Sequence, residues 1–394
     1  MKRQILSIAI ALMALAPNIE ANNIDYVLQQ IKLNNTQLKA LNAEIEAQTA
    51  DIKSSNNLSD PTIDGAYLFG VGSIGDKWEL GVSQEFDWPG IYSARGKVNK
   101  ARIEALAQSY AQKQIQIFSE ARNICLEIIC LNRRIKFENN ILANLDSLYD
   151  KSLKGLEYGE ISILDTNKLK IERLGVTQSI AGNKALLQAK IKQLEGLNGN
   201  IPLNDVASLS DYPEQQLHSL DEYLSQMKAS DPQLRQISSE IEASNKQVSV
   251  TRMQNLPKFS LGYRHVNEIG DHFNGVGVGL SIPVFENRGK NKAAKAQAIA
   301  SQLSFDDVIS TRTAEITASH QKAVAVRQQL DGYRDALLKC NNIEILDKAL
   351  YGGQISLINY LLELRYFIEA QNALIDIEFE YNTLITDLNK YTNL

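Results

Sequence analysis

Apolar and polar residues alternate with a period of two in four short segments of the chain. These segments lie at about 61–70, 77–88, 257–265 and 275–284. In the last of them, Val276, Val278 and Leu280 alternate with glycines. A period of two predicts β-strands, because successive side chains of a strand point to opposite faces. Runs of this length, mostly apolar on one side and small or polar on the other, are typical of transmembrane barrel strands.

The apolar positions of these strands are candidates for contact with lipid. Aromatic residues cluster near the strand ends, as the interfacial girdles of membrane proteins do. The predicted lipid-facing residues are Tyr67, Trp78, Leu80, Val82, Phe86, Phe259, Tyr263, Val276, Val278 and Leu280. The same pattern is compatible with two soluble hairpins that pack on a helical core.

Most of the remaining chain has apolar residues spaced by three and four, which predicts α-helices. The two longest runs, at about 95–154 and 289–351, contain no proline. The first would form a helix of about 85 Å. Further helices are expected at about 161–195 and 355–392. The narrow apolar stripes of these helices indicate coiled-coil packing.

The order of elements occurs twice. Glu44-Ile45-Glu46-Ala47 and Ile74-Gly75-Asp76 return as Glu240-Ile241-Glu242-Ala243 and Ile269-Gly270-Asp271. Such an internal repeat constrains the architecture of the whole chain. We expect a first repeat at 22–200, a connector at 201–220 and a second repeat at 221–394. The predicted fold class is mainly α with a small β part, built from two tandem repeats.

The first 21 residues have the features of a secretory signal peptide. Lys2 and Arg3 precede an apolar stretch that is too short to cross a bilayer as a helix. The rest of the sequence contains no run typical of a transmembrane helix, so any membrane insertion would use the strands. Four strands cannot close a barrel, and lipid does not tolerate open sheet edges. Membrane insertion would therefore require several copies of the chain.

Composition and motifs give no sign of catalysis. The net charge of −5 argues against a nucleic-acid binder. The sequence lacks the G-x-S-x-G, Walker A, H-E-x-x-H and C-x-x-C patterns, so we expect no enzyme activity, no cofactor and no metal site. The three cysteines are interpreted as structural apolar residues, and the four histidines as surface or loop residues.

Two matched turns connect the predicted long helices to the helices that follow them. Their key residues are Gly159 and Ser162 in the first turn and Gly353 and Ser356 in the second. Glycine can end a helix where a positive φ is needed, and serine can cap the next helix. A plain helical hairpin turn would also account for them.

The order of elements resembles that of the TolC family of bacterial outer-membrane efflux channels. A signal peptide comes first, and two copies of helix, strand, strand, long helix, G-x-x-S turn and helix follow it. The resemblance covers about residues 24–392. The segment 83–90, followed by Arg95, is similar to the branch that is paired with heavy-metal RND pumps.

The resemblance implies a homotrimer in the outer membrane, with a barrel of four strands from each chain and a helical tunnel that extends into the periplasm. It implies a passive exit duct that works with a periplasmic adaptor and an inner-membrane pump of the RND type. The cargo would be small molecules or metal ions. The two G-x-x-S turns would form the tips that contact the adaptor.

The resemblance also places a constriction at the periplasmic entrance, where acidic rings occur in the family. The matching positions are Asn359, Leu362 and Glu363, with Asp165 in the first repeat. A ring of asparagine would lack the charge that selects or blocks cations. Glu363 could instead lie on a solvated helix face.

Other functions remain compatible with the sequence. The chain could be the outer-membrane component of a type I protein secretion system. It could be a soluble periplasmic coiled-coil scaffold, in which the strands have no membrane role. A helical enzyme or ligand-binding protein is a third class, for which the sequence offers no site.

Overall fold

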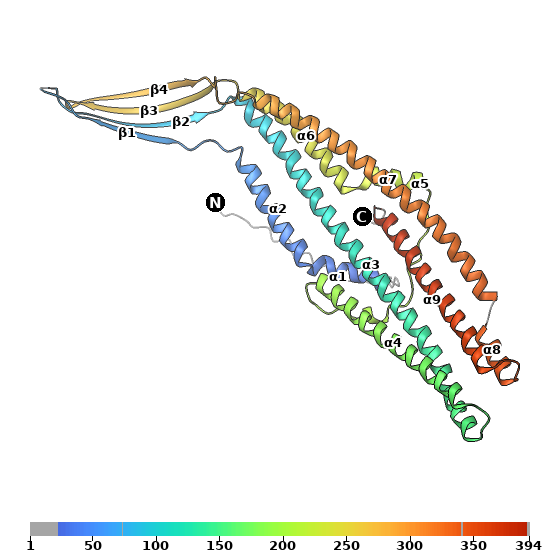
Figure 1. Cartoon of the computed structure of the whole chain (residues 1–394). Helices are drawn as coiled ribbons and strands as arrows, with labels where there is room; N and C mark the ends of the chain where they lie inside the picture. Colours follow the sequence, from blue (N-terminus) through green and yellow to red (C-terminus); the bar gives the residue numbers. More distant parts are fainter. Residues whose placement is uncertain (1–22, 73, 340–341, 392–394) are drawn as a thin grey trace, which may run out of the picture.

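The computed structural model describes residues 23–72, 74–339 and 342–391. The predicted signal peptide lies outside these residues. The molecule is elongated, with a β-sheet at one end and long helices that extend away from it (Figure 1). The predicted fold class, long paired helices together with a small four-stranded sheet, is confirmed.

Along the sequence, the helices fall into two groups, one in each half of the chain. The first group runs α1 (Asn23–Asn34), α2 (Thr36–Ser54), α3 (Pro89–Glu157) and α4 (Ile163–Leu197). A connector with a short 3₁₀ turn, η1 (Val206–Ser208), follows. The second group runs α5 (Leu220–Ser230), α6 (Pro232–Met253), α7 (Lys290–Lys339), α8 (Asn342–Tyr351) and α9 (Leu357–Leu388), and ends with η2 (Asn389–Tyr391).

The four strands form one antiparallel sheet in the order β1-β2-β3-β4. They are β1 (Thr62–Leu68), β2 (Lys77–Phe86), β3 (Lys258–Glu268) and β4 (Asp271–Ser281). The central pairing of β2 with β3 aligns Val82 with Tyr263 and joins the two halves of the chain. A turn of two residues, Ile269 and Gly270, connects β3 to β4.

Helix α3, with 69 residues, is the longest element and spans about 100 Å. It starts at Pro89, several residues before the position expected from the sequence, because proline is well suited to the first turn of a helix. Apolar clusters are distributed along α3 instead of forming one central core. One of them packs Ile128 and Ile129 against α1, and another packs Leu145 against Tyr360 of α9.

The long helix expected at 289–351 is described as two helices. Helix α7 ends at Lys339 and α8 begins at Asn342. Residues 340–341, between these two helices, lie outside the described residues.

A buried carboxylate links three helices near the middle of the molecule. Glu378 of α9 is 8% exposed and accepts hydrogen bonds from Arg133 of α3 at 2.7 Å and from Arg334 of α7 at 2.6 Å. The Arg133 guanidinium also lies over the ring of Tyr212, at 4.7 Å from its centroid. The charged cluster therefore ties α3, α7 and α9 to the connector.

Candidate functional sites

The sheet brings the ten predicted lipid-facing residues onto one face. Directly paired residues in an antiparallel sheet project to the same side, and the register pairs Phe86 with Phe259 and Phe259 with Leu280. By the same alternation, Tyr67, Trp78, Leu80, Val82, Tyr263, Val276 and Val278 share this face. Val278, for example, is 79% exposed in the single chain, so the face is an uncovered apolar surface.

The opposite face of the sheet is polar and contains several ion pairs. Arg264 of β3 lies 3.6 Å from Asp64 of β1 and 3.4 Å from Glu79 of β2. Lys258 lies 3.1 Å from Glu85. On β4 this face carries the glycines 275, 277 and 279, so the sheet combines an apolar side with a polar side that has few bulky groups.

Both edges of the sheet are open in the single chain. Strand β1 pairs with β2 and strand β4 pairs with β3, which leaves the outer side of β1 and of β4 without a strand partner among the described residues. Unpaired edges expose backbone donors and acceptors that can pair with another chain.

Two histidines lie on the apolar face, near the end of the sheet that is remote from the helices. His265 Nδ1 is 2.7 Å from Asn274 Oδ1, and His272 Nδ1 is 3.2 Å from the Asn267 amide. The two imidazole rings stack with centroids 5.7 Å apart. No group of three or more potential metal ligands occurs in the described part of the chain.

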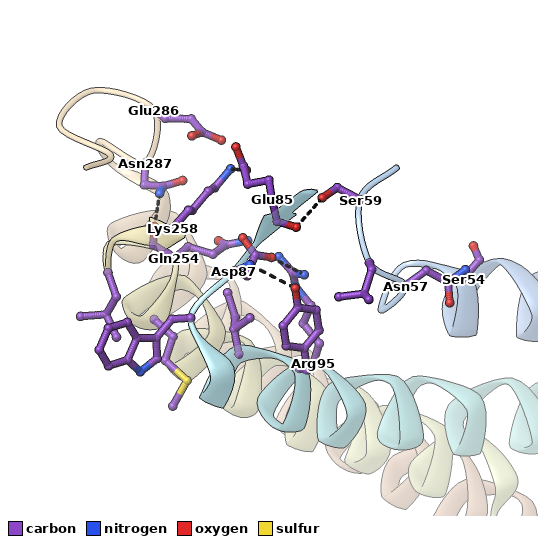
Figure 2. A pocket seen from close by; sticks show the side chains of 16 residues that line it. Ser54, Asn57, Ser59, Glu85, Asp87, Arg95, Gln254, Lys258, Glu286 and Asn287 are labelled. Atoms are coloured by element: carbon purple, nitrogen blue, oxygen red, sulfur yellow. Dashed lines mark hydrogen bonds and ion pairs between the residues drawn. The ribbon is translucent and has the colours of Figure 1, made fainter. Parts of the chain in front are cut away.

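A cavity of about 300 Å³ lies where the sheet meets the helices (Figure 2). Asp87 and Arg95 form an ion pair of 2.8 Å at one side of it, and Glu85 pairs with Lys258 near its centre. The hydroxyl of Tyr92 accepts a hydrogen bond from the backbone of Asp87. The contacts of Asp87 fasten the end of β2 to the first turns of α3, and the pair of Glu85 with Lys258 links β2 to β3.

The two matched turns have the same geometry. Gly159 and Gly353 have φ angles of 73° and 68°, in the region that favours glycine. In the first turn the Glu160 amide donates to Gly155 at 2.8 Å, and in the second the Gln354 amide donates to Ala349 at 2.8 Å. Each helix thus ends in a Schellman motif. Both turns lie at the end of the molecule opposite the sheet (Figure 1).

Serine caps the helix that follows each turn. Ser162 Oγ accepts from the Asp165 amide at 3.2 Å, and Ser356 Oγ accepts from the Asn359 amide at 3.3 Å. Asp165 and Asn359 therefore occupy the same position in the first turns of α4 and α9. Hydrogen bonds from Ser162 and Lys168 lower the pKa of Asp165.

The predicted aperture residues lie on two different hairpins. Leu362 is 49% exposed, and Asn359 and Glu363 are exposed on the first turns of α9. Asp165 lies on α4, and within the described residues of one chain no hydrogen bond or ion pair joins it to any of the three.

Next to these residues lies a buried cluster that the sequence pattern did not reveal. The Tyr360 side chain is fully buried, and its hydroxyl is 2.8 Å from Asp347 of α8 and 2.9 Å from Asn144 of α3. Arg365 of α9 forms a second link, at 3.2 Å to Glu172 of α4. The only signal in the sequence was a tyrosine at a core position of α9.

Among the described helices, none combines the length and the apolarity that crossing a membrane requires.

The long paired helices, the sheet with one apolar face and the two capped turns define the fold of the outer-membrane efflux channels. No family model and no curated relative matches the chain. The solved structure of CusC has a TM-score of 0.77 at 14% sequence identity and covers 96% of this chain and 95% of its own. The outer membrane channel CmeC of Campylobacter jejuni has a TM-score of 0.75 at 20% identity, with coverages of 94% and 85%.

A third similar structure is the outer membrane protein VceC of Vibrio cholerae, with a TM-score of 0.75, 14% identity and coverages of 93% and 95%. At these identities the similarity establishes the fold. The resemblance to the TolC-like channels that the sequence predicts is confirmed at this level. The neighbours are channels of the bacterial outer membrane, which is the location expected from the sequence.

Proposed function

We propose that the chain is a passive exit duct of the bacterial outer membrane. Three copies would join the open edges of their sheets into a barrel of twelve strands, four from each chain. The helices would continue this barrel as a tunnel into the periplasm. The proposed duct has no catalytic role, and it carries small molecules or metal ions outward.

The observation that carries this proposal is the division of the sheet into two unlike faces. Lipid favours the apolar face with Leu80 and Val278, and water favours the face with the ion pairs of Arg264. Strand β3, with 11 residues, has the length that a tilted strand needs to cross a bilayer. The open edges at β1 and β4 supply the reason for assembly, because a barrel in lipid must be closed.

At the opposite end, we propose that the two capped turns contact a periplasmic adaptor. Gly159, Ser162, Gly353 and Ser356 are exposed there and leave the backbone of both turns accessible. The adaptor would link the duct to an inner-membrane pump, for which the RND type is our choice because of the segment 83–90.

We also propose that Asn359, Leu362 and Glu363, with Asp165, narrow the periplasmic entrance. The position of these residues supports the proposal, because all four lie in the first two helical turns after the matched serine caps. Three copies of each would surround the axis of the trimer. In the proposed trimer, the three copies of Asn359 would form a neutral ring where the TolC family has an acidic one. Any selection of ions by charge at this entrance would therefore depend on Glu363 and Asp165.

Cysteine labelling tests the position of the sheet in the membrane. Leu80→Cys and Val278→Cys should react with lipid-phase reagents, whereas Ser83→Cys and Gly277→Cys should react with aqueous ones. Gly277 is a suitable control because nothing lies within 4 Å of an added Cβ there. The native Cys125 and Cys130 are buried, and Cys340→Ser removes the remaining thiol. Equal aqueous labelling at all four positions would contradict the proposal.

Native mass spectrometry in mild detergent tests the assembly, and three chains are expected. A monomer that stays soluble without detergent would favour the periplasmic scaffold. Co-purification with a type I secretion adaptor would assign the duct to protein secretion.

A further inference from the structure

A groove of about 400 Å³ lies between α4 and α9, with α3 beneath it. The three helices run side by side in this half of the molecule (Figure 1). Its lining includes the apolar side chains of Phe137 and Ile141 from α3, Ile171 and Val176 from α4, and Ile368 from α9. This volume and this apolar lining are typical of sites for small organic molecules.

The groove is also lined by a buried carboxylate without a counter-ion. Glu138 of α3 is 6% exposed. One of its carboxylate oxygens accepts from the Ser179 hydroxyl at 2.6 Å, and the other accepts from the Asn183 amide at 2.9 Å. Both donors are neutral, and among the described residues no side-chain nitrogen of lysine, arginine or histidine lies within 4 Å of the Glu138 carboxylate oxygens. The equally buried Glu378, in contrast, is held by two arginines.

A buried carboxylate without a counter-ion is costly even when neutral groups donate hydrogen bonds to it, and a cation that reaches it would relieve this cost. The other charged residues of the groove do not compensate Glu138. Arg365 is paired with Glu172 at 3.2 Å, so these two charges cancel. Glu369 adds a second negative charge at the exposed rim. The groove therefore carries net negative charge within apolar walls.

Glycine keeps one wall of the groove open. Gly175 of α4 lines the groove, and no heavy atom lies within 4 Å of a Cβ added at this position. The first side-chain carbon of a larger residue at position 175 would therefore meet no protein atom. The helix itself does not require glycine here, because its backbone is helical.

From these observations we propose that the groove binds a hydrophobic organic cation, with the positive charge next to Glu138 and the apolar groups against the walls. Charge selects a cation, and the lining selects one with a large apolar surface. This site is separate from the sheet and from the aperture residues, and it does not rest on the proposed function.

The test is calorimetric titration of the full-length protein in nonionic detergent with tetraphenylphosphonium. Tetraphenylborate, which has the same shape and the opposite charge, is the matched probe. We expect saturable binding of one phosphonium per chain and none of the borate. Glu138→Gln should weaken phosphonium binding about tenfold or more, because it removes the buried charge and keeps the size of the side chain.

Two further variants separate charge from shape. Gly175→Leu fills the groove without changing its charge, and we expect a similar loss of binding with an unchanged far-UV circular dichroism spectrum. Glu369→Gln removes the exposed rim charge and should weaken binding less than threefold, because water screens that charge. Equal affinity for the borate, unchanged affinity in Glu138→Gln, unchanged affinity in Gly175→Leu, or no saturable phosphonium binding would each overturn the proposal. If Glu138→Gln does not fold, Gly175→Leu decides alone.

Discussion

The charged cluster around Glu378 allows a quantitative prediction about stability. Replacing Glu378 by alanine leaves Arg133 and Arg334 facing each other without the carboxylate that joins them. Loss of one partner from a fully buried ion pair costs about 3–5 kcal/mol. The side chains of Arg133 and Arg334 are 31% and 48% exposed, so water can partly replace the lost contact. We therefore expect a loss of about 2 kcal/mol in the free energy of unfolding.

The matched control is Glu380→Ala on the same helix. Glu380 pairs with Lys322 at 2.7 Å, but the two side chains are 41% and 59% exposed. Exposed pairs contribute about 0–1 kcal/mol, so this variant should unfold almost as the native protein does. Both substitutions remove one carboxylate and place alanine in α9, which makes their difference a measure of burial.

The assay is urea unfolding of the purified protein in nonionic detergent, followed by the helical circular dichroism signal. Glu378→Ala should lower the midpoint clearly, with a slope similar to that of the native protein. Equal midpoints for Glu378→Ala and Glu380→Ala would refute the argument that this cluster holds the three helices together.

The remaining predictions concern the end of the molecule with the two turns. Gly353→Val places a β-branched residue at a positive φ and should destabilise the turn by about 1–2 kcal/mol. We expect this variant to lose efflux while the trimer persists, and efflux at the native level would contradict the proposed role of the tip. Leu362→Ala should raise the conductance of the channel in planar bilayers. Glu363→Gln should weaken its preference for cations, because three carboxylates near the axis set the local field. Unchanged conductance and unchanged cation preference in both variants would place the constriction elsewhere. Tyr360→Phe removes a buried hydrogen bond to Asp347 and should lower the free energy of unfolding by about 1.5–3 kcal/mol, whereas an unchanged urea midpoint would show that this hydroxyl contributes little.

Much of the fold was predictable because it depends on local patterns. The alternation in Val276, Val278 and Leu280 predicted both the strand and its apolar face, and the register of the sheet confirms that the predicted residues share one side. The Gly-x-x-Ser turns were predictable for a similar reason, since a positive φ and a serine cap each have a sequence signature.

The polar contacts between distant segments were not predictable. Glu138 meets Asn183, and Glu378 meets Arg133, across many intervening residues, and neither pair has a characteristic spacing. Such contacts depend on how the helices are placed against each other, which a periodic pattern does not specify.

The short turn between β3 and β4 affects how much of the protein would be accessible from outside the cell. Only Ile269 and Gly270 connect these two strands, and Ile269 has a φ of 52°, which a β-branched residue rarely adopts. A channel that crosses the outer membrane through this sheet would present almost no loop on the cell exterior at this hairpin. Antibodies and bacteriophage receptor-binding proteins, which usually attach to long surface loops, would find little to recognise there. In such a channel, an epitope tag inserted between residues 269 and 270 would therefore create an external handle at this hairpin.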